Sequence, residues 1–228
     1  MRPGAVLRAS LLWRCFVNEP IPSLAESLDS ESLTDFFSTI GDAALDVAIS
    51  SRALDGVPIF GALTSLFRAQ RDIRKSLFVR QVARFLFGLK RTTEEDRRRF
   101  TGRLRKEGKL EEFGEAILLI LDRVNDTNKP TIIGRIMAAH IAGEIEYVKA
   151  MRLVSIVDRC YAEDLEYLRS FQPGLQGPWS EIAAMLQAAG LLAISGEDLG
   201  GFTEDEPGGS LYELTSYGRL FVKFGLSP

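Results

Sequence analysis

Residues that could perform catalysis or hold a metal ion are few in this sequence and far apart. There is one histidine, His140, with Glu144 four residues later, and the two cysteines, Cys15 and Cys160, show no paired spacing. A zinc site needs three or four ligands, and no glycine-rich loop is followed by Lys-Ser or Lys-Thr. We therefore expect a protein that is not an enzyme and has no cofactor, no metal site and no small-molecule substrate.

The environment of these residues also favours structural roles. His140 lies in the apolar run MAAHIAG, so we expect it to be buried as part of a helix. Chemistry between His140 and a cysteine would require the fold to bring them together, which spacing alone does not show. Two cysteines without paired spacing favour free thiols in a reducing compartment. Together with the lack of an apolar run of about 20 residues, this predicts a cytoplasmic protein.

The strongest compositional signal is a block of basic residues in the middle of the chain. Residues 68–109 carry 15 basic and 5 acidic side chains, a net charge of +10, whereas residues 156–228 have a net charge of −7. The planar guanidinium of arginine suits two-point contacts with phosphate. The candidate residues for binding a partner or a polyanion are Arg68, Arg71, Arg74, Lys75, Arg97, Arg98, Arg99, Arg103, Arg105 and Lys106.

Two interpretations of this block remain open. It could bind a polyanion such as RNA, DNA or an anionic lipid surface, with most of the cations between 97 and 106 exposed to water. Alternatively, it could pair with the chain's own acidic surface, notably the C-terminal tail. Exposed ion pairs stabilise a fold by only about 0–1 kcal/mol each, so a need for stability does not explain the block.

The elements that must position these residues are predicted to be helices. The run from Ile59 to Lys90 repeats apolar residues at three- and four-residue steps, with Leu77 among them. The repeat changes register near residues 70–72, which leaves a break of the helix there open. The spacing predicts helices over residues 32–51, 59–90, 91–107, 110–124, 131–142, 144–157 and 161–171. Short connections between helices predict a mainly α fold, an antiparallel multi-helix bundle over residues 21–171 that follows a tail of residues 1–20.

Local signals place the ends of these helices. Pro20 and Pro22 end the tail, and Thr92 with Glu95 fits a capping box. Gly108 ends that helix, Asn128 is the expected N-cap of a later one, and Pro130 fits its first turn.

Beyond Phe171 the pattern becomes α+β. A short helix over residues 179–189, with Met185 expected on its inner side, precedes strands at 191–195 and 211–214, and Thr215 is expected to cap a last helix. The helix, Ala189-Gly190-Leu191-Leu192, the hairpin, and Tyr212-Glu213-Leu214-Thr215 with Gly218 and Phe221 resemble the end of a winged-helix domain. The resemblance implies a winged-helix-like module over residues 172–228.

Winged helices often place a recognition helix in the major groove of DNA. Here the corresponding helix, WSEIAAMLQAA, has no cation, and the predicted wing carries Glu197, Asp198, Glu204, Asp205 and Glu206. Affinity for DNA comes mostly from basic side chains that neutralise phosphates. We therefore expect this module to dock onto protein, in a partner or in the same chain.

Taken together, these patterns predict a non-catalytic interaction or regulatory module of a cytoplasmic, bacterial-type protein. It would bind a protein partner through its basic face, residues 68–109, and through its acidic C-terminal module. The alternative is a nucleic-acid or anionic-membrane binder whose acidic tail covers the basic face until it is displaced.

Overall fold

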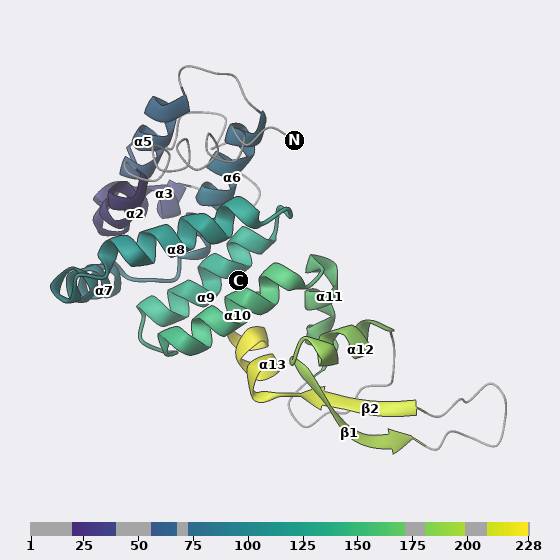
Figure 1. Ribbon diagram of the computed structural model, residues 1–228. Helices are drawn as coiled ribbons and strands as arrows, with labels where there is room; N and C mark the ends of the chain where they lie inside the picture. Colours follow the sequence, from purple (N-terminus) through teal and green to yellow (C-terminus); the bar gives the residue numbers. More distant parts are fainter. Residues whose placement is uncertain (1–19, 40–55, 68–72, 172–180, 199–208, 228) are drawn as a thin grey trace, which may run out of the picture. The chain divides into compact units, whose positions relative to one another are not determined.

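The protein is mainly helical, with one two-stranded antiparallel sheet near its C-terminus, as the sequence predicted (Figure 1). The structure, a computed structural model, describes residues 20–39, 56–67, 73–171, 181–198 and 209–227. Backbone contacts divide the chain into two compact units, Met1–Asn125 and Asp126–Pro228. This division differs from the boundary predicted after Phe171, since three helices that precede Phe171 belong to the second unit.

The first unit is built around its earliest described helix. Its helices are α2 (Pro20–Asp29), α3 (Glu31–Thr39), α5 (Pro58–Phe67), α6 (Ile73–Gly88), α7 (Glu94–Glu107) and α8 (Leu110–Arg123). Helix α2 packs against α5, α7 and α8, while α6 packs against α8. The core is formed by fully buried side chains from all of these helices, among them Leu24, Leu28, Leu33, Leu63, Val82, Leu86, Phe100, Ile117 and Leu121.

Two close approaches position α2. The hydroxyl of Ser27 is buried; it accepts a hydrogen bond from the Ile59 amide at 2.8 Å and donates one to the Ser23 carbonyl at 2.6 Å. This satisfies one of the free amides at the start of α5. On the other side, a Cβ at Gly114 of α8 would lie 3.1 Å from the Ile21 carbonyl, so a glycine lets α8 approach the α2 backbone closely.

The first unit differs from the predicted helices in a few places. Pro20 and Pro22 lie in the first turn of α2, a helix that was not predicted, where a missing amide costs no hydrogen bond. The helix predicted over residues 32–51 begins at Glu31 and is described to Thr39, and its remainder lies outside the described residues. Helices α5 and α6 occupy the long apolar run on either side of the expected change of register near residues 70–72. Leu77, predicted to be buried, is 52% exposed.

The second unit combines helices with the hairpin. Its elements are α9 (Lys129–Ile141), α10 (Tyr147–Arg159), α11 (Ala162–Tyr167), η2 (Leu168–Ser170), α12 (Glu181–Ala188), β1 (Leu192–Asp198), β2 (Gly209–Leu214), α13 (Ser216–Phe221) and the π-helical turn η3 (Val222–Leu226). Helix α9 is buried along most of its length and packs against α10 and η3. The C-terminal turn therefore completes the core around α9.

The start of α9 is capped by a residue other than the expected one. Asn128 occupies the N-cap position, but its side chain makes no capping bond. The Asp126 carboxylate instead accepts hydrogen bonds from the amides of Asn128 at 2.6 Å and Lys129 at 3.2 Å. Pro130 lies in the first turn, as predicted.

The hairpin pairs Leu192 with Leu214 and Ile194 with Tyr212, and an irregularity between Ile194 and Gly196 shifts the register. Helix α12 packs on β1, and its buried residues are Ala183 and Leu186. Met185, expected on the inner side, is 65% exposed.

Helix α13 is fixed to the base of the hairpin. The Thr215 hydroxyl accepts a hydrogen bond from the Gly218 amide at 3.0 Å, which confirms Thr215 as the N-cap. A Cβ at Gly218 would lie 2.1 Å from the Leu191 carbonyl, so only glycine permits this contact.

In the part of the chain that the structure describes, no helix combines the length and apolar character needed to cross a bilayer.

Candidate functional site

The candidate site is helix α7, which carries most of the described cations predicted to bind a partner. Its first turn is held by a capping box, one residue later than predicted. The Thr93 hydroxyl accepts a hydrogen bond from the Asp96 amide at 3.1 Å, while the Asp96 carboxylate accepts bonds from the Thr93 hydroxyl at 2.7 Å and the Thr93 amide at 3.3 Å. The Thr93 hydroxyl thereby lowers the pKa of Asp96 below its ordinary value.

The predicted capping pair, Thr92 with Glu95, is wrong because the Thr92 hydroxyl makes a different hydrogen bond. Thr92 is buried, and its hydroxyl donates to the Leu89 carbonyl at 2.7 Å. At the other end, Gly108 adopts a left-handed conformation with φ of 68° and ends α7, as predicted. The helix is thus defined at both ends.

One face of α7 packs against the core of the first unit. Phe100 meets the Phe113 ring of α8 edge to face, at 5.0 Å between centroids. Thr101 is fully buried, and its hydroxyl donates to the Asp29 carboxylate at the end of α2. The opposite face of the helix is exposed to solvent.

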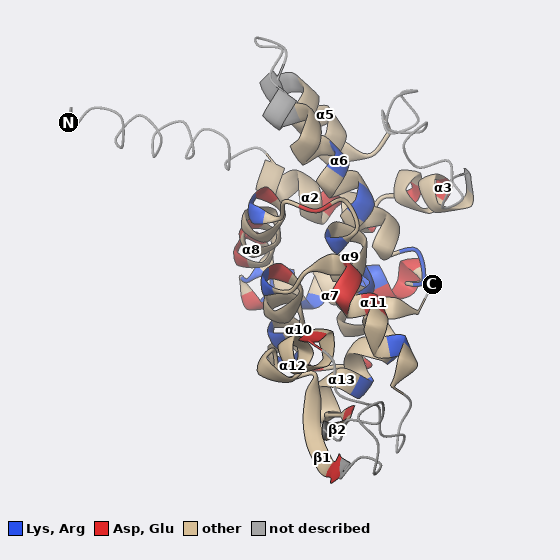
Figure 2. Ribbon diagram, turned by 90° about the vertical axis from the view of Figure 1, so that its right-hand side faces the viewer, with Lys and Arg blue, Asp and Glu red and all other residues tan. Residues whose placement is uncertain are grey.

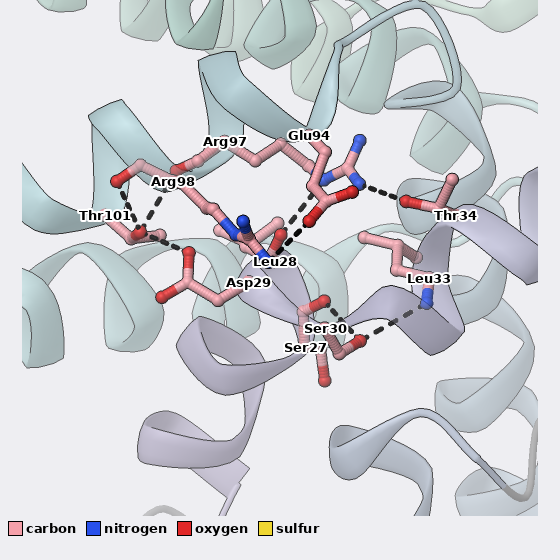
Figure 3. A network of polar contacts seen from close by, with 10 residues as sticks. All are labelled: Ser27, Leu28, Asp29, Ser30, Leu33, Thr34, Glu94, Arg97, Arg98 and Thr101. Carbon is pink, nitrogen blue, oxygen red and sulfur yellow. Dashed lines mark hydrogen bonds and ion pairs between the residues drawn. The ribbon is translucent and has the colours of Figure 1, made fainter.

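Arg97 does not belong to the exposed face, contrary to the prediction. It is 1% exposed and donates hydrogen bonds to the Leu28 carbonyl at 3.0 Å and the Thr34 hydroxyl at 2.7 Å (Figure 3). It also donates one to the Thr92 carbonyl at 2.9 Å. Its guanidinium also lies 5.4 Å from the centroid of the Phe37 ring. Burial lowers the pKa of this guanidinium, yet arginine stays protonated in proteins. Arg97 therefore joins α2, α3 and α7.

Five other basic side chains of α7 are exposed, which agrees with the prediction for them: Arg98, Arg99, Arg103, Arg105 and Lys106. No acidic residue occurs between Arg98 and Lys106, whereas Glu94, Glu95 and Asp96 precede them and Glu107 follows. Figure 2 colours Lys and Arg blue and Asp and Glu red along the ribbon. The cationic face is defined here as these five residues. Along the helix axis it extends over about 12 Å.

Three members of the cationic face make exposed ion pairs. Arg98 lies 2.6 Å from Glu94, Arg99 lies 2.9 Å from Asp96, and Arg105 lies 3.3 Å from Asp29. The arginine side chains of these pairs are 58% to 65% exposed. Pairs of this kind contribute about 0–1 kcal/mol, so an anionic ligand could replace the carboxylates at little cost.

Arg103 and Lys106 differ from the other three. Among the residues that the structure describes, neither has a carboxylate within ion-pair distance; Arg103 lies 5.6 Å from the centroid of the Phe100 ring. An open hollow of about 750 Å³ borders the N-terminal half of the face, beside Glu94, Glu95, Arg98 and Arg99. Ligand groups can therefore reach this side of the helix.

The other predicted binding residues are not brought to this face by any described contact. Arg68 and Arg71 lie outside the described residues, and for Arg74 and Lys75 only the helical backbone of α6 is described. Their proposed role stays a prediction.

One residue of the site was not singled out in the sequence. Gly102 lies in the middle of α7 and is exposed. A Cβ placed there would meet no described heavy atom within 4 Å, and the backbone conformation is one that any residue adopts. Glycine inside a helix costs about 1 kcal/mol relative to alanine. The fold of the first unit thus gives no reason for a glycine at this position.

Of the residues considered for catalysis, His140, Glu144 and Cys160 lie in the second unit, and Cys15 lies outside the described residues. His140 is 9% exposed, and its Nδ1 lies 3.0 Å from the Ile145 carbonyl, so it is buried as expected. Cys160 is a free thiol beside a cavity of about 480 Å³ that Tyr161 and Met185 also line. Burial raises the pKa of this thiol, which disfavours the reactive thiolate.

Among the side chains that the structure describes, no group of three His, Cys, Asp or Glu residues is placed to hold a metal ion.

The chain matches no protein-family model, no curated protein and no solved structure.

Proposed function

We propose that this protein is a non-catalytic interaction module that binds an acidic segment of a partner protein through the cationic face of α7. The observation that carries the proposal is the placement of five exposed cations within three turns of one helix, with no acidic residue among them. Three turns of cations provide a compact positive field for a short acidic segment.

The spacing of these cations supports a binding role over a purely structural one. Arg99 and Arg103 are four residues apart and Arg103 and Lys106 are three apart, so they are neighbours on the helix surface. Like-charged neighbours destabilise a helix by about 0.2–0.5 kcal/mol per pair. Among the described residues, no carboxylate pairs with Arg103 or Lys106 to offset this repulsion. An arrangement that weakens the helix is consistent with selection for an external ligand.

The composition of the face favours a protein over a membrane. An amphipathic helix that inserts at a bilayer surface needs large apolar side chains on its exposed face. Between Arg98 and Lys106 the exposed residues are basic or glycine, while Phe100 is buried. The face therefore offers charge and no apolar anchor.

The proposal extends to the rest of the chain. We place the module in the cytoplasm, on the basis of its two cysteines without paired spacing. We also propose that residues 172–228 form a winged-helix-like module that contacts protein instead of DNA. The exposed residues of α12 include Glu181, Met185 and Gln187 but no cation.

The alternative, a polyanion binder covered by its own acidic tail, stays a prediction. Of the five acidic residues of the predicted wing, Glu204, Asp205 and Glu206 lie outside the described residues, Asp198 is described by its backbone in β1 alone, and Glu197 is exposed.

The test measures binding of the full chain to a fluorescein-labelled glutamate-rich peptide by anisotropy, at stepped salt concentrations. Arg103→Glu and Lys106→Glu should each weaken binding several-fold, because each replaces an attraction by a repulsion at the contact. Affinity should also fall steeply from low to physiological salt, since exposed charges are screened over about 8–10 Å.

The matched control is Lys149→Glu, which makes the same change in net charge at an exposed position of α10. If it weakens binding as much as Lys106→Glu does, the cationic face is not the binding site. Affinity that does not change with salt would also contradict the proposal.

A further inference from the structure

Gly102 occupies the centre of the cationic face. Residues three and four positions away on either side of a helical residue are its neighbours on the helix surface, at about 5–6 Å between Cβ atoms. For Gly102 these four neighbours are Arg98, Arg99, Arg105 and Lys106, and all four are exposed and basic. A residue without a side chain is therefore surrounded by four cations.

The space above Gly102 is open. No described side chain lies within 4 Å of the position that a Cβ would take, so the four cations leave the centre of their ring free. Any side chain at position 102 would project into that centre. A glycine instead leaves the helix surface between these four positions open to a ligand atom.

The centre of this ring suits a compact and multiply charged anion. A phosphate monoester carries a charge of about −1.5 to −2 at pH 7 and three strong acceptor oxygens. A carboxylate has one charge, so it engages fewer of the four cations at once. Guanidinium groups bind phosphate oxygens with two parallel hydrogen bonds, and three of the four neighbours are arginines.

We propose that Gly102 forms the base of a binding site for one phosphate group, presented by a phosphorylated serine or threonine of the partner protein. This inference rests on the proposed function, because it names the chemistry that the cationic face recognises. Arg98, Arg99, Arg105 and Lys106 contact the phosphate, and Arg103 attracts acidic residues beside it.

The length of the face decides between a phosphorylated protein segment and a nucleic acid. The cations extend over about 12 Å of helix, and a DNA duplex presents one phosphate charge per about 1.7 Å of its axis. A duplex that follows the helix would place phosphates against Glu94 and Glu95 at one end and Glu107 at the other. A single phosphate group needs only the basic turns, and to bind Arg98 and Arg99 it takes the place of Glu94 and Asp96 in their exposed ion pairs.

The test uses the full chain and a pool of labelled peptides with one fixed phosphoserine among otherwise neutral residues. Two matched pools carry glutamate or serine at that position. The phosphoserine pool should bind at least about tenfold more tightly than the glutamate pool. Gly102→Leu should reduce its affinity to the level of the glutamate pool, although leucine favours the helix and should raise the midpoint of thermal unfolding.

Gly61→Leu is the matched control. Gly61 is exposed in α5, and a Cβ there also meets no described heavy atom within 4 Å, but its neighbours at three and four residues are Val57, Pro58, Thr64 and Ser65. This variant should bind the phosphoserine pool as the unchanged chain does. The same measurements with a single-stranded oligonucleotide and with phosphatidylserine vesicles compare the other sources of phosphate.

The outcomes separate the inference from the proposed function. Equal binding of the phosphoserine and glutamate pools, or unchanged binding by Gly102→Leu, overturns the proposed phosphate-binding site. The proposed function still holds in that case if Lys106→Glu weakens binding of the glutamate-rich peptide, and both are wrong if it does not. Tighter binding of the oligonucleotide or the vesicles than of the phosphoserine pool overturns the assignment to a phosphorylated protein.

Discussion

The buried guanidinium of Arg97 connects three segments of the first unit. It donates to the last turn of α2 through Leu28, to α3 through Thr34 and to the segment before α7 through Thr92. Hydrogen bonds that involve a charged partner contribute about 1.5–3 kcal/mol each. Arg97 is therefore a structural centre of the first unit, next to the exposed cationic face.

Replacing Arg97 should destabilise the first unit strongly. Arg97→Met keeps an apolar side chain of moderate length but leaves the buried carbonyl groups of Leu28 and Thr92 without their donor, so we expect a loss of about 3 kcal/mol or more. Arg97→Lys should also destabilise, because one ammonium cannot reproduce the planar fork of donors. Urea unfolding of the full chain measures both effects.

Arg98→Ala is the comparison for this prediction. Arg98 makes only an exposed pair with Glu94, so its loss should cost about 0–1 kcal/mol. Similar losses for Arg97→Met and Arg98→Ala would show that the buried network does not stabilise the fold.

At the scale of single residues, the sequence predicted the exposure of five cations of α7 but not the burial of Arg97. The exposure of Arg98, Arg99, Arg103, Arg105 and Lys106 followed from the scarcity of apolar residues on α7. Arg97 has the same side chain as Arg98 and Arg99. Only its position in the sequence places it on the buried face of the helix, since it lies three residues before Phe100 and four before Thr101. Its hydrogen-bond partners are distant in the sequence, so nothing local indicates them.

The element that carries the site begins with the capping box of Thr93 and Asp96. Thr93→Ala should destabilise α7 by about 1 kcal/mol, because the Asp96 amide loses its side-chain acceptor and the Asp96 carboxylate loses the hydroxyl donor. Glu95→Ala should have little effect, although the sequence had indicated Glu95 as the capping residue. Denaturant unfolding that ranks Glu95→Ala with Thr93→Ala would contradict the observed cap.

The same cap predicts a dependence of stability on pH. The hydrogen bond from Thr93 lowers the pKa of Asp96 in the folded protein. A lowered folded pKa stabilises the fold above the unfolded pKa of about 3.9, and this contribution is lost as pH falls through the folded value. The stability difference between the unchanged chain and Asp96→Asn should be constant at neutral pH and disappear in acid. A difference that grows on acidification would contradict this sign.

Helix existence was predictable and helix boundaries were less so. Apolar periodicity located the helices from α5 to α10, because burial of one face requires that spacing. Helix α2 was missed because Pro20 and Pro22 indicate a break unless they are known to lie in a first turn. The exposed Met185 and Leu77 show that periodicity defines a stripe but does not say whether another element covers it.

At the scale of the whole molecule, the C-terminal turn belongs to the core of the second unit. Phe224 and Leu226 of η3 are buried, η3 packs against α9, and Arg169 donates to the Leu226 carbonyl. A boundary after Phe171 was predicted because the composition changes there, but contacts between residues far apart in sequence cross that point.

Removing residues 172–228 should therefore unfold the second unit. Helix α9 would expose apolar side chains that η3 now covers, and α10 packs on α9, so hydrogen exchange should become fast from Ile132 to Leu168. Protection in α6 and α8 of the first unit should persist, because their buried residues pack within residues 1–125. Retained protection of α9 in the truncated chain would contradict this.

The contact between α9 and η3 also has a consequence for synthesis on the ribosome. Residues 20–125 can begin to fold as soon as they emerge, because α2 meets its partners within that stretch. Helix α9 follows directly, yet it must wait for about ninety more residues before Phe224 and Leu226 arrive to cover it. At about 5–20 residues per second this interval lasts several seconds. During that time the apolar side chains of α9 that η3 later covers are exposed on the nascent chain. We therefore expect a cotranslational chaperone to bind at α9.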